Sequence, residues 1–496
     1  MKEGIGKTVV RNFSIVFGAR AVTWISGFIL LLFLPRYLGS QDYGRLYLAL
    51  SIKMMLGLLV DFGGAYLIPK EVARSEKVGS KILSSYLILR VLLWVVSIGI
   101  IIIISHLLGY SEHIRLLILV LAVSMLWEGG SKAYSAYFQG IERMEYSSLG
   151  MIAEKVFVAI FAVAALLLGA DSFGIAIIMT IGALLHLIVV FLFHRKFATL
   201  NFKFDSKVFT LLSSGMPYFL FSLFSVIYYR IDAVMLSSFT SETVTGWYGG
   251  AYRFFDMVMM LPLIYKAVIF PVFSKLWDDE NGTLQKTISK SLKLIIILGV
   301  PASLLIFIYA ENVIHFFMGL EEYAGSVIIL QIFALSIPII YVDLIIGSAI
   351  LGAANRQRAW AFVGFIAIFL NVGVNYFLIP YAQGMYMNGG IGAAVATFIT
   401  ELFMLSSALY LLPNDFLRTF KMAYITKPVI AGAGMVAIVW LLNTTSLYWM
   451  LTAAIGGVAY LAGLYVLQLF DDEEMAILKD IASVQGLKMM LSTKNS

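Results

Sequence analysis

Charged side chains interrupt several long apolar stretches of this sequence, and they are the residues with which it could do chemistry. A charge at membrane depth costs about 2.5 kcal/mol on insertion scales, so each such residue needs a partner or a function. Arginine and lysine can replace the hydration of a phosphorylated ligand, and arginine offers planar bidentate contacts. Isolated carboxylates at that depth are typical proton or cation sites. Snorkelling of a long side chain to the membrane surface is the alternative.

The first half of the sequence holds the excess of embedded positive charge. Four embedded bases oppose two acids there, whereas three bases oppose four acids in the second half. An anionic ligand therefore favours the first half. Arg20 lies about 14 Å into its expected helix, which is deep for snorkelling. We predict that Arg20, Lys53 and Arg90 bind an anionic substrate, with structural ion pairs as the alternative.

The stretch FSVIYYRIDAVMLSSF places Arg230 and Asp232 two residues apart. Such residues do not face each other on a helix, so each needs its own partner. Arg253 and Asp256 are three apart and can pair. All four are predicted to be gate or cavity-rim residues. The alternative is a structural anchor for Arg230 and Asp232, and a self-neutralising structural pair for Arg253 and Asp256.

Four further acids are candidates for ion coupling, namely Asp61, Glu128, Asp343 and Glu401. Only Glu128 has an evident partner on its own helix, because Lys132 follows one turn later. Glu154 and Lys155 lie near an expected cytoplasmic helix end and are interpreted as interfacial.

Other chemistry has little support in the sequence. It has no cysteine, its five histidines show no metal-ligand spacing, and it contains no Walker phosphate loop. We therefore expect no metal, no cofactor, no catalytic residue and no enzymatic activity.

Composition identifies the class of protein. Of 496 residues, 61% are hydrophobic and 13% are charged, whereas soluble domains are about 45–50% apolar and about 25% charged. The sequence predicts an all-α polytopic membrane protein. Fourteen windows of about 20 apolar residues are expected to span the membrane. They lie at 11–34, 44–68, 82–108, 115–138, 148–169, 174–193, 209–237, 246–273, 291–311, 325–353, 359–380, 391–412, 428–443 and 448–470.

The distribution of Lys and Arg predicts the orientation. Twenty-four of the 35 basic residues lie at the termini and in alternate loops on one side, and the opposite loops hold only Arg36, Arg45 and Arg115. By the positive-inside rule both termini are cytoplasmic in a plasma or inner membrane. The net charge of +6 is then a topology signal, and no nucleic-acid partner is expected.

Two pairs of glycines suggest an internal repeat. Gly44, in LGSQDYGRLYLAL, and Gly246, in TSETVTGWYGGAY, are 202 residues apart, while Gly140 and Gly352 are 212 apart. The nearly equal offsets predict two six-helix lobes. Because six is even, the repeat is parallel, about a pseudo-twofold axis along the membrane normal.

This repeat predicts the division of the chain. The parts are an N-lobe (1–193), a cytoplasmic linker (194–207), a C-lobe (208–412), a helix pair (413–470) and a cytoplasmic tail (471–496). The tail spaces apolar residues on one helical face, which is typical of an amphipathic helix at a membrane surface.

The sequence also resembles a known family. The resemblance depends on five segments: PRYLGSQDYG, SSGMPYFLFS with Gly215 and Pro217, YYRIDAVML, and the turns FQGIERMEYSS and ILGAANRQRAW. They resemble the polysaccharide-export branch of the MOP superfamily, the Wzx-type flippases. The resemblance implies two lobes around a central cavity, two extra C-terminal helices, and alternating-access translocation of a polyprenyl-diphosphate-linked oligosaccharide to the outer leaflet.

Two alternatives remain open at this stage. One is a cation-coupled multidrug exporter of the same superfamily. The other is a membrane-embedded glycosyltransferase or polymerase, which normally needs a large loop outside the membrane. For the flippase we expect membrane lipid and a coupling cation or proton as further partners, and a monomeric protein.

Overall fold

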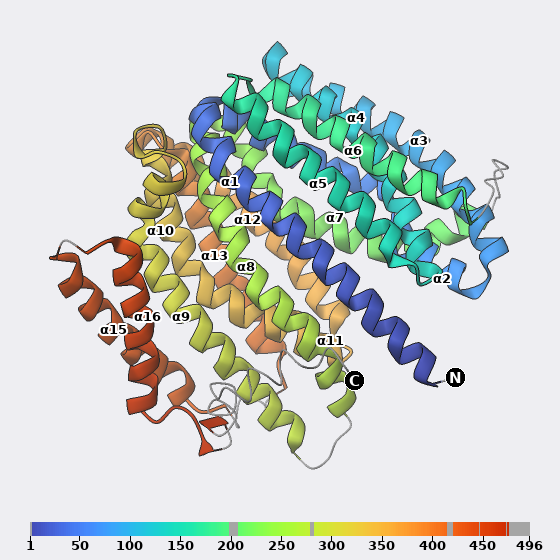
Figure 1. The fold of residues 1–496 in the computed structure, drawn as a ribbon. Coiled ribbons are helices and arrows are strands. Elements are labelled where there is room, and N and C mark those ends of the chain that lie inside the picture. Colours follow the sequence, from blue (N-terminus) through green and yellow to red (C-terminus); the bar gives the residue numbers. More distant parts are fainter. Residues whose placement is uncertain are drawn as a thin grey trace. The chain divides into compact units, whose positions relative to one another are not determined.

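The computed structural model folds the chain into long helices (Figure 1). It describes residues 2–197, 207–277, 282–413, 420–445, 447–472 and 474–475. Among these residues, twelve helices are long and apolar enough to span a membrane. The predicted all-α polytopic fold is therefore confirmed.

The helices coincide with the predicted apolar segments. In the first half they are α1 (Lys2–Asp61), α2 (Gly64–Arg74), α3 (Glu76–Leu107), α4 (Glu112–Gly140), α5 (Met144–Leu167), α6 (Ser172–His194) and α7 (Lys207–Phe239). In the second half they are α8 (Glu242–Leu276), α9 (Thr283–Phe317), α10 (Leu320–Asp343), the π-helix η1 (Leu344–Ile350), α11 (Leu351–Ala353), α12 (Gln357–Tyr386), α13 (Gly389–Leu411), α15 (Ala423–Asn443) and α16 (Trp449–Val466).

Glycine conformation decides where the first helices bend. Gly39, with φ of 70°, kinks α1 between the first two predicted segments. The predicted second segment, 44–68, is wrong in its boundary, because the helix ends at Asp61 and a new one begins at Gly64. Phe62 and Gly63 form this break, with φ of 39° and 75°. Glycine adopts this left-handed region without steric cost.

The chain divides into two compact units. Unit 1 comprises Met1–Phe254, Val313–Leu330 and Ala361–Thr400, and unit 2 comprises Phe255–Asn312, Gln331–Trp360 and Glu401–Ser496. Much of the predicted linker (194–207) and most of the predicted tail (471–496) lie outside the described residues. The division into lobes therefore stays a prediction.

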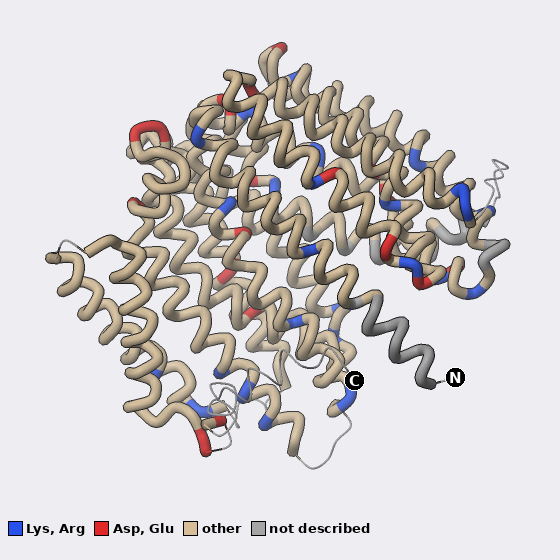
Figure 2. The backbone as a smooth tube through the Cα atoms, viewed as in Figure 1, with Lys and Arg blue, Asp and Glu red and all other residues tan. Residues whose placement is uncertain are grey.

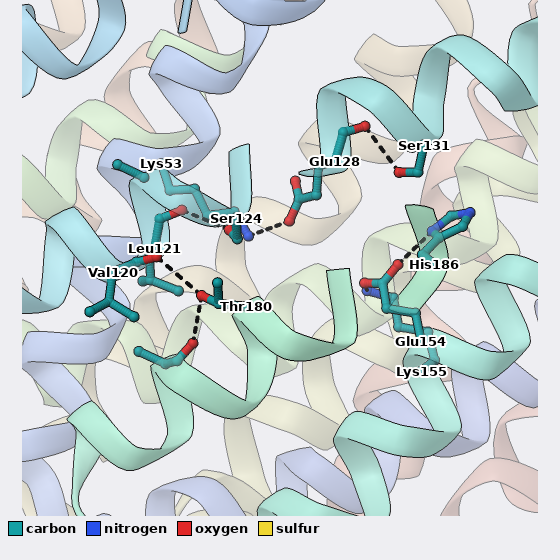
Figure 3. Close-up of polar contacts among 12 residues, drawn as sticks. Lys53, Val120, Leu121, Ser124, Glu128, Ser131, Glu154, Lys155, Thr180 and His186 are labelled. Carbon is teal, nitrogen blue, oxygen red and sulfur yellow. Dashed lines mark hydrogen bonds and ion pairs between the residues drawn. The ribbon is translucent and has the colours of Figure 1, made fainter. Parts of the chain in front are cut away.

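Within unit 1, α1 packs against α4, α5 and α7, and α6 packs against α4 and α5 (Figure 1). Helices in lipid gain little from apolar burial, so close approach at small residues holds them together. Gly182 shows this, because a Cβ added there would lie 2.4 Å from a methyl group of Val158. The Thr180 hydroxyl adds a hydrogen bond of 3.1 Å from α6 to the Val120 carbonyl of α4 (Figure 3).

The two aligned glycines, Gly44 of α1 and Gly246 of α8, lie in reciprocal contact inside unit 1. A Cβ at Gly44 would lie 1.9 Å from the carbonyl oxygen of Glu242, and one at Gly246 would lie 1.9 Å from that of Ser40. Each contacted carbonyl belongs to the residue four positions before the other glycine. The two helices thus cross backbone to backbone in the same register.

Unit 2 contains the C-terminal hairpin of α15 and α16. The Tyr309 hydroxyl of α9 lies 2.6 Å from the Thr452 hydroxyl of α16, and the Tyr460 hydroxyl donates to the Ile297 carbonyl at 3.1 Å. Lys293, which is buried, forms an ion pair with Glu474 just beyond the hairpin. These contacts attach the hairpin and the chain that follows it to α9.

The Gly44–Gly246 crossing predicts a stability effect. Gly246→Ala is expected to destabilise the protein by about 1–3 kcal/mol, because overpacking against backbone cannot be relieved by a side-chain rotation. Thermal unfolding in detergent measures this loss.

Gly99→Ala in α3 is the matched control, because no other group lies within 4 Å of a Cβ at that position. Alanine is the better helix former, so this variant should melt at or above the wild-type temperature. Equal melting temperatures for Gly246→Ala and wild type would contradict the tight crossing.

Candidate functional site

A cavity of about 470 Å³ lies entirely within unit 1. Residues of α1, α4, α5, α6, α7 and α8 line it. On α1, Thr23, Gly27 and Leu30 share one helix face because they are three or four residues apart. Helices that are distant in sequence therefore build one site.

The cavity wall carries more positive than negative charge. Its basic residues are Lys53, Lys132, Lys155, Arg230 and Arg253, and its acidic residues are Glu128 and Glu154. Figure 2 shows that charged residues of both signs also lie partway along the long helices. A cleft lined by one sign of charge concentrates ligands of the opposite sign, so this cavity favours an anion.

Lys53 of α1 forms an ion pair with Glu128 of α4 (Figure 3). The sequence suggested Lys132 as the partner of Glu128, and the structure instead supplies Lys53 from another helix. Lys132 also lines the cavity, is exposed, and forms no ion pair with another described residue. The predicted substrate residue Lys53 is thus in the cavity wall, with its charge already compensated.

Glu154, Lys155 and His186 form a second charged cluster at the wall (Figure 3). The Glu154 carboxylate lies 2.6 Å from Lys155 Nζ and 2.8 Å from His186 Nδ1. Both Glu154 and Lys155 line the cavity, and their interpretation as interfacial residues stays a prediction. Ser148, Gly150, Glu154, Val158 and Ala162 are buried along α5. The small residues Ser148, Gly150 and Ala162 on the same helix as Glu154 were the signal that could have revealed an inward-facing helix surface.

Arg230 of α7 lies at the cavity wall between aromatic rings. Its guanidinium carbon is 5.9 Å from the Tyr47 ring centre and 5.2 Å from that of Tyr252. It also donates to the Tyr47 hydroxyl at 3.4 Å. Such cation–π contacts hold a guanidinium in a fixed orientation.

Asp232, two residues later, is buried in a different environment. Its carboxylate accepts hydrogen bonds from the Tyr248 hydroxyl at 2.6 Å, the Asn375 amide at 2.7 Å and the Thr397 hydroxyl at 3.1 Å. Arg230 and Asp232 therefore have separate partners, as helical geometry predicted. This network joins α7, α8, α12 and α13.

Arg90 is buried and is not among the residues that line the cavity. Its guanidinium donates to the Asp61 carboxylate and to the Gly129 carbonyl. Gly64 makes room for it, since a Cβ there would lie 2.6 Å from an Arg90 nitrogen. This cluster connects α1, α3 and α4 beside the break at residues 62–63.

Arg20 is exposed on α1, one turn before Thr23 of the cavity wall. The structure brings Lys53 into the cavity, places Arg20 next to its lining residues on the same helix, and buries Arg90 elsewhere. Arg253 lines the cavity, and Asp256 lies partly buried one turn later on α8. Which of these residues contact a substrate stays a prediction.

The coupling candidates fall into two groups. Asp61 and Glu128 form ion pairs in unit 1. Asp343 and Glu401 are buried in unit 2, close enough for their carboxyl groups to interact electrostatically. Asp343 directly precedes the π-helix η1, and π-helical turns often occur at functional sites.

A second cavity, of about 560 Å³, lies entirely within unit 2. Residues of α9, α10, η1, α13 and α15 line it, and Ser303 is the single hydroxyl-bearing residue among them. Its chemistry matches hydrocarbon.

Comparison with known proteins identifies the family. The family model described as polysaccharide biosynthesis protein matches residues 9–277, more than half of the 496-residue chain. The chain belongs to the polysaccharide biosynthesis protein family. The resemblance found in the sequence is thereby confirmed, and the matched region contains all residues that line the charged cavity. A model described as MatE also matches residues 217–377.

A curated relative comes from Haloferax volcanii. The protein named "Probable low-salt glycan biosynthesis flippase Agl15" is 23% identical over 380 residues, which cover 75% of this chain and 77% of that protein.

Two solved structures share the fold of this polysaccharide biosynthesis family member. "Lipid II flippase MurJ, inward closed conformation" gives a TM-score of 0.73 at 16% identity, covering 92% of this chain and 98% of that one. "Inward-facing conformation of a multidrug resistance MATE family transporter of the MOP superfamily" gives 0.61 at 14% identity, covering 79% and 96%. At these identities the similarity concerns the fold alone.

The buried Arg90–Asp61 pair predicts a non-additive effect on stability. Arg90→Leu should cost about 3–5 kcal/mol, because it leaves a carboxylate in apolar surroundings. Adding Asp61→Asn should restore part of the loss, as measured by melting temperature in detergent. Strictly additive losses in the double variant would contradict a structural pair.

Proposed function

We propose that this protein is a flippase that moves a polyprenyl-diphosphate-linked oligosaccharide from the cytoplasmic to the outer leaflet. The observation that carries the proposal is the cavity in unit 1, where five basic and two acidic residues converge from separate helices. A diphosphate that enters the membrane loses hydration, and fixed cations can replace it. Family membership and the Haloferax volcanii relative support the same conclusion.

The cavity cations have different parts in the proposal. Lys132, Arg230 and Arg253 contact the diphosphate, with Arg230 held in place by its aromatic neighbours. Lys53 joins them when the substrate replaces Glu128 as its partner. Arg20, one turn from the cavity wall, meets the headgroup at the entrance.

Arg90 has a structural part in the proposal. Its charge is already used by Asp61 and by a backbone carbonyl, and it is 1% exposed. Recruiting it for the substrate would leave the partly buried Asp61 without this partner, which is costly. We therefore assign it to helix packing.

The apolar cavity of unit 2 suits the hydrocarbon part of the substrate. Its lining residues on α9, α13 and α15 are almost entirely aliphatic or aromatic. Burial of a prenyl chain there would be favourable at about 0.8 kcal/mol per CH₂ group removed from water.

The proposal includes the membrane arrangement inferred from the sequence. It has fourteen spans, two parallel six-helix lobes (1–193 and 208–412), the pair within 413–470, cytoplasmic termini and a monomeric state in the cell membrane. The reciprocal register of Gly44 and Gly246 supports the parallel repeat. Ion coupling is assigned to Asp343 and Glu401, because a proton or cation bound there would relieve the repulsion between two buried carboxyl groups.

Alternating access requires the crossing of α1 and α8 to open on the outer side. Around this crossing, Arg45 Nε lies 2.7 Å and Gln41 Nε2 lies 2.9 Å from the Glu242 carboxylate. These polar contacts can be broken and resolvated at a membrane surface at low cost. We propose that they close the outer entrance.

A cation-coupled multidrug exporter is the second candidate, favoured by the MatE match over residues 217–377. Its usual cationic cargo would be repelled by the surplus of basic residues in the cavity. The charge of the cavity therefore favours the flippase, and neither candidate is an enzyme.

The first test removes cavity cations. Lys132→Gln and Arg230→Gln should each reduce flipping of a polyprenyl-diphosphate sugar in proteoliposomes by at least about tenfold, since a lost charge-assisted contact is worth roughly 1.5–3 kcal/mol. Arg20→Ala should also impair transport.

Lys275→Gln is the matched control, because Lys275 is exposed at the end of α8 and does not line the cavity. Wild-type rates in the cavity variants would refute their assignment. Export of cationic drugs by proteoliposomes that do not flip the lipid-linked sugar would favour the multidrug alternative.

The second test concerns the outer closure. The chain has no native cysteine, so Arg45→Cys and Glu242→Cys introduce a unique pair. A short reducible thiol crosslinker should stop transport in the double variant, and reducing agent should restore it. Each single variant controls for modification alone, and undiminished transport by the crosslinked protein would contradict this gate.

A further inference from the structure

The cluster of Glu154, Lys155 and His186 combines three titratable side chains on α5 and α6. Glu154 is shared between two partners, with one carboxylate oxygen 2.6 Å from Lys155 Nζ and the other 2.8 Å from His186 Nδ1. The side chains of Glu154 and His186 are 11% and 13% exposed, whereas that of Lys155 is 45% exposed. The Glu154 carboxylate is therefore mostly buried, whereas the side chain of Lys155, which it neutralises, is more exposed at the cavity wall.

The tautomer of His186 follows from its partners. An ionised carboxylate can only accept, so Nδ1 carries the hydrogen that is donated to Glu154. Nε2 is buried without a hydrogen-bond partner among the described residues. It packs against Gly150, where a Cβ would lie 2.5 Å from His186 Cδ2 and 3.0 Å from Nε2. The geometry thus fits the tautomer with Nδ1–H, and Nε2 is left without a hydrogen-bond partner among the described residues.

A second proton would change this arrangement. Nε2–H would point at Gly150 without an acceptor, which is unfavourable for a buried donor, so the ring must move away from the glycine. The resulting imidazolium would also compensate the charge of Glu154. The attraction between Glu154 and Lys155 would weaken in consequence, because the carboxylate would then be paired with a full positive charge.

The surrounding elements supply charges of both signs. Those that line the same cavity are Lys53 of α1, Glu128 and Lys132 of α4, Arg230 of α7 and Arg253 of α8. Lys53 and Glu128 compensate each other. A bound anion would add negative charge to the cavity wall that Lys155 reaches.

We propose that Glu154, Lys155 and His186 form a proton-binding site that is linked to binding of the substrate's diphosphate. His186 Nε2 takes up a proton as the ring moves away from Gly150, the imidazolium then pairs with Glu154, and Lys155 leaves Glu154 to contact the diphosphate. Histidine suits this role because it changes charge between pH 5 and 8. The inference rests on the proposed diphosphate-binding cavity and adds a titratable switch to it.

The test measures proton uptake and affinity together. Geranyl diphosphate serves as the probe and is titrated into the purified full-length protein by calorimetry, in buffers with different ionisation enthalpies. The wild type should take up more protons per bound probe than His186→Gln, and its affinity should increase more steeply from pH 8 to pH 6. Protonation of the probe itself is common to both proteins and cancels in this comparison.

Two variants separate a linked site from a structural one. Glu154→Gln should bind the probe more tightly than wild type at pH 8, because Lys155 is then free. Lys155→Gln should bind about tenfold more weakly, corresponding to about 1.4 kcal/mol. A purely structural role for Glu154 would instead weaken binding or leave it unchanged.

His106→Gln is the matched control, since His106 is exposed at the end of α3 and does not line the cavity. It should retain wild-type proton uptake. Equal proton uptake in wild type and His186→Gln would overturn the inference while leaving the flippase proposal intact. Failure of the wild type to bind the probe, with Lys132→Gln and Arg230→Gln no different, would overturn both.

Discussion

The cost of an uncompensated charge in an apolar protein organises this molecule. Every embedded ion must meet an opposite charge, a set of hydrogen-bond donors, or a space that a polar ligand can enter. The structure uses all three solutions. Arg90 meets Asp61, Asp232 is surrounded by hydroxyl and amide donors, and Arg230 borders a cavity.

Acidic residues neutralise only some of the basic residues in the charged cavity, and this suits transport. Lys53 and Lys155 are each held by a single carboxylate, on Glu128 and Glu154. Such pairs keep the empty site stable, yet they can be exchanged for a phosphate of similar charge. Because a carrier must release what it binds, exchangeable partners serve it better than a set of cations with no internal counter-charge.

Close backbone packing makes the polar arrangement possible. Glycine allows Arg90 to enter beside residue 64 and His186 to lie against residue 150, and it lets α1 and α8 cross at residues 44 and 246. These contacts hold helices together where apolar burial contributes little. At the crossing, the close fit involves two backbones, so separation would not require side chains to repack.

Much of this protein was determined by its sequence alone. The apolar windows, the interrupting charges and the aligned glycines gave the membrane class, the helix positions and the family, because periodicity and hydropathy are local properties. Helical geometry also showed that Arg230 and Asp232 need separate partners. Only the tertiary structure decided the partners themselves. Glu128 pairs with Lys53 instead of Lys132, Arg90 is not among the cavity residues, and Glu154 lines the cavity. These outcomes depend on which faces of distant helices meet, and no single segment of the sequence encodes that.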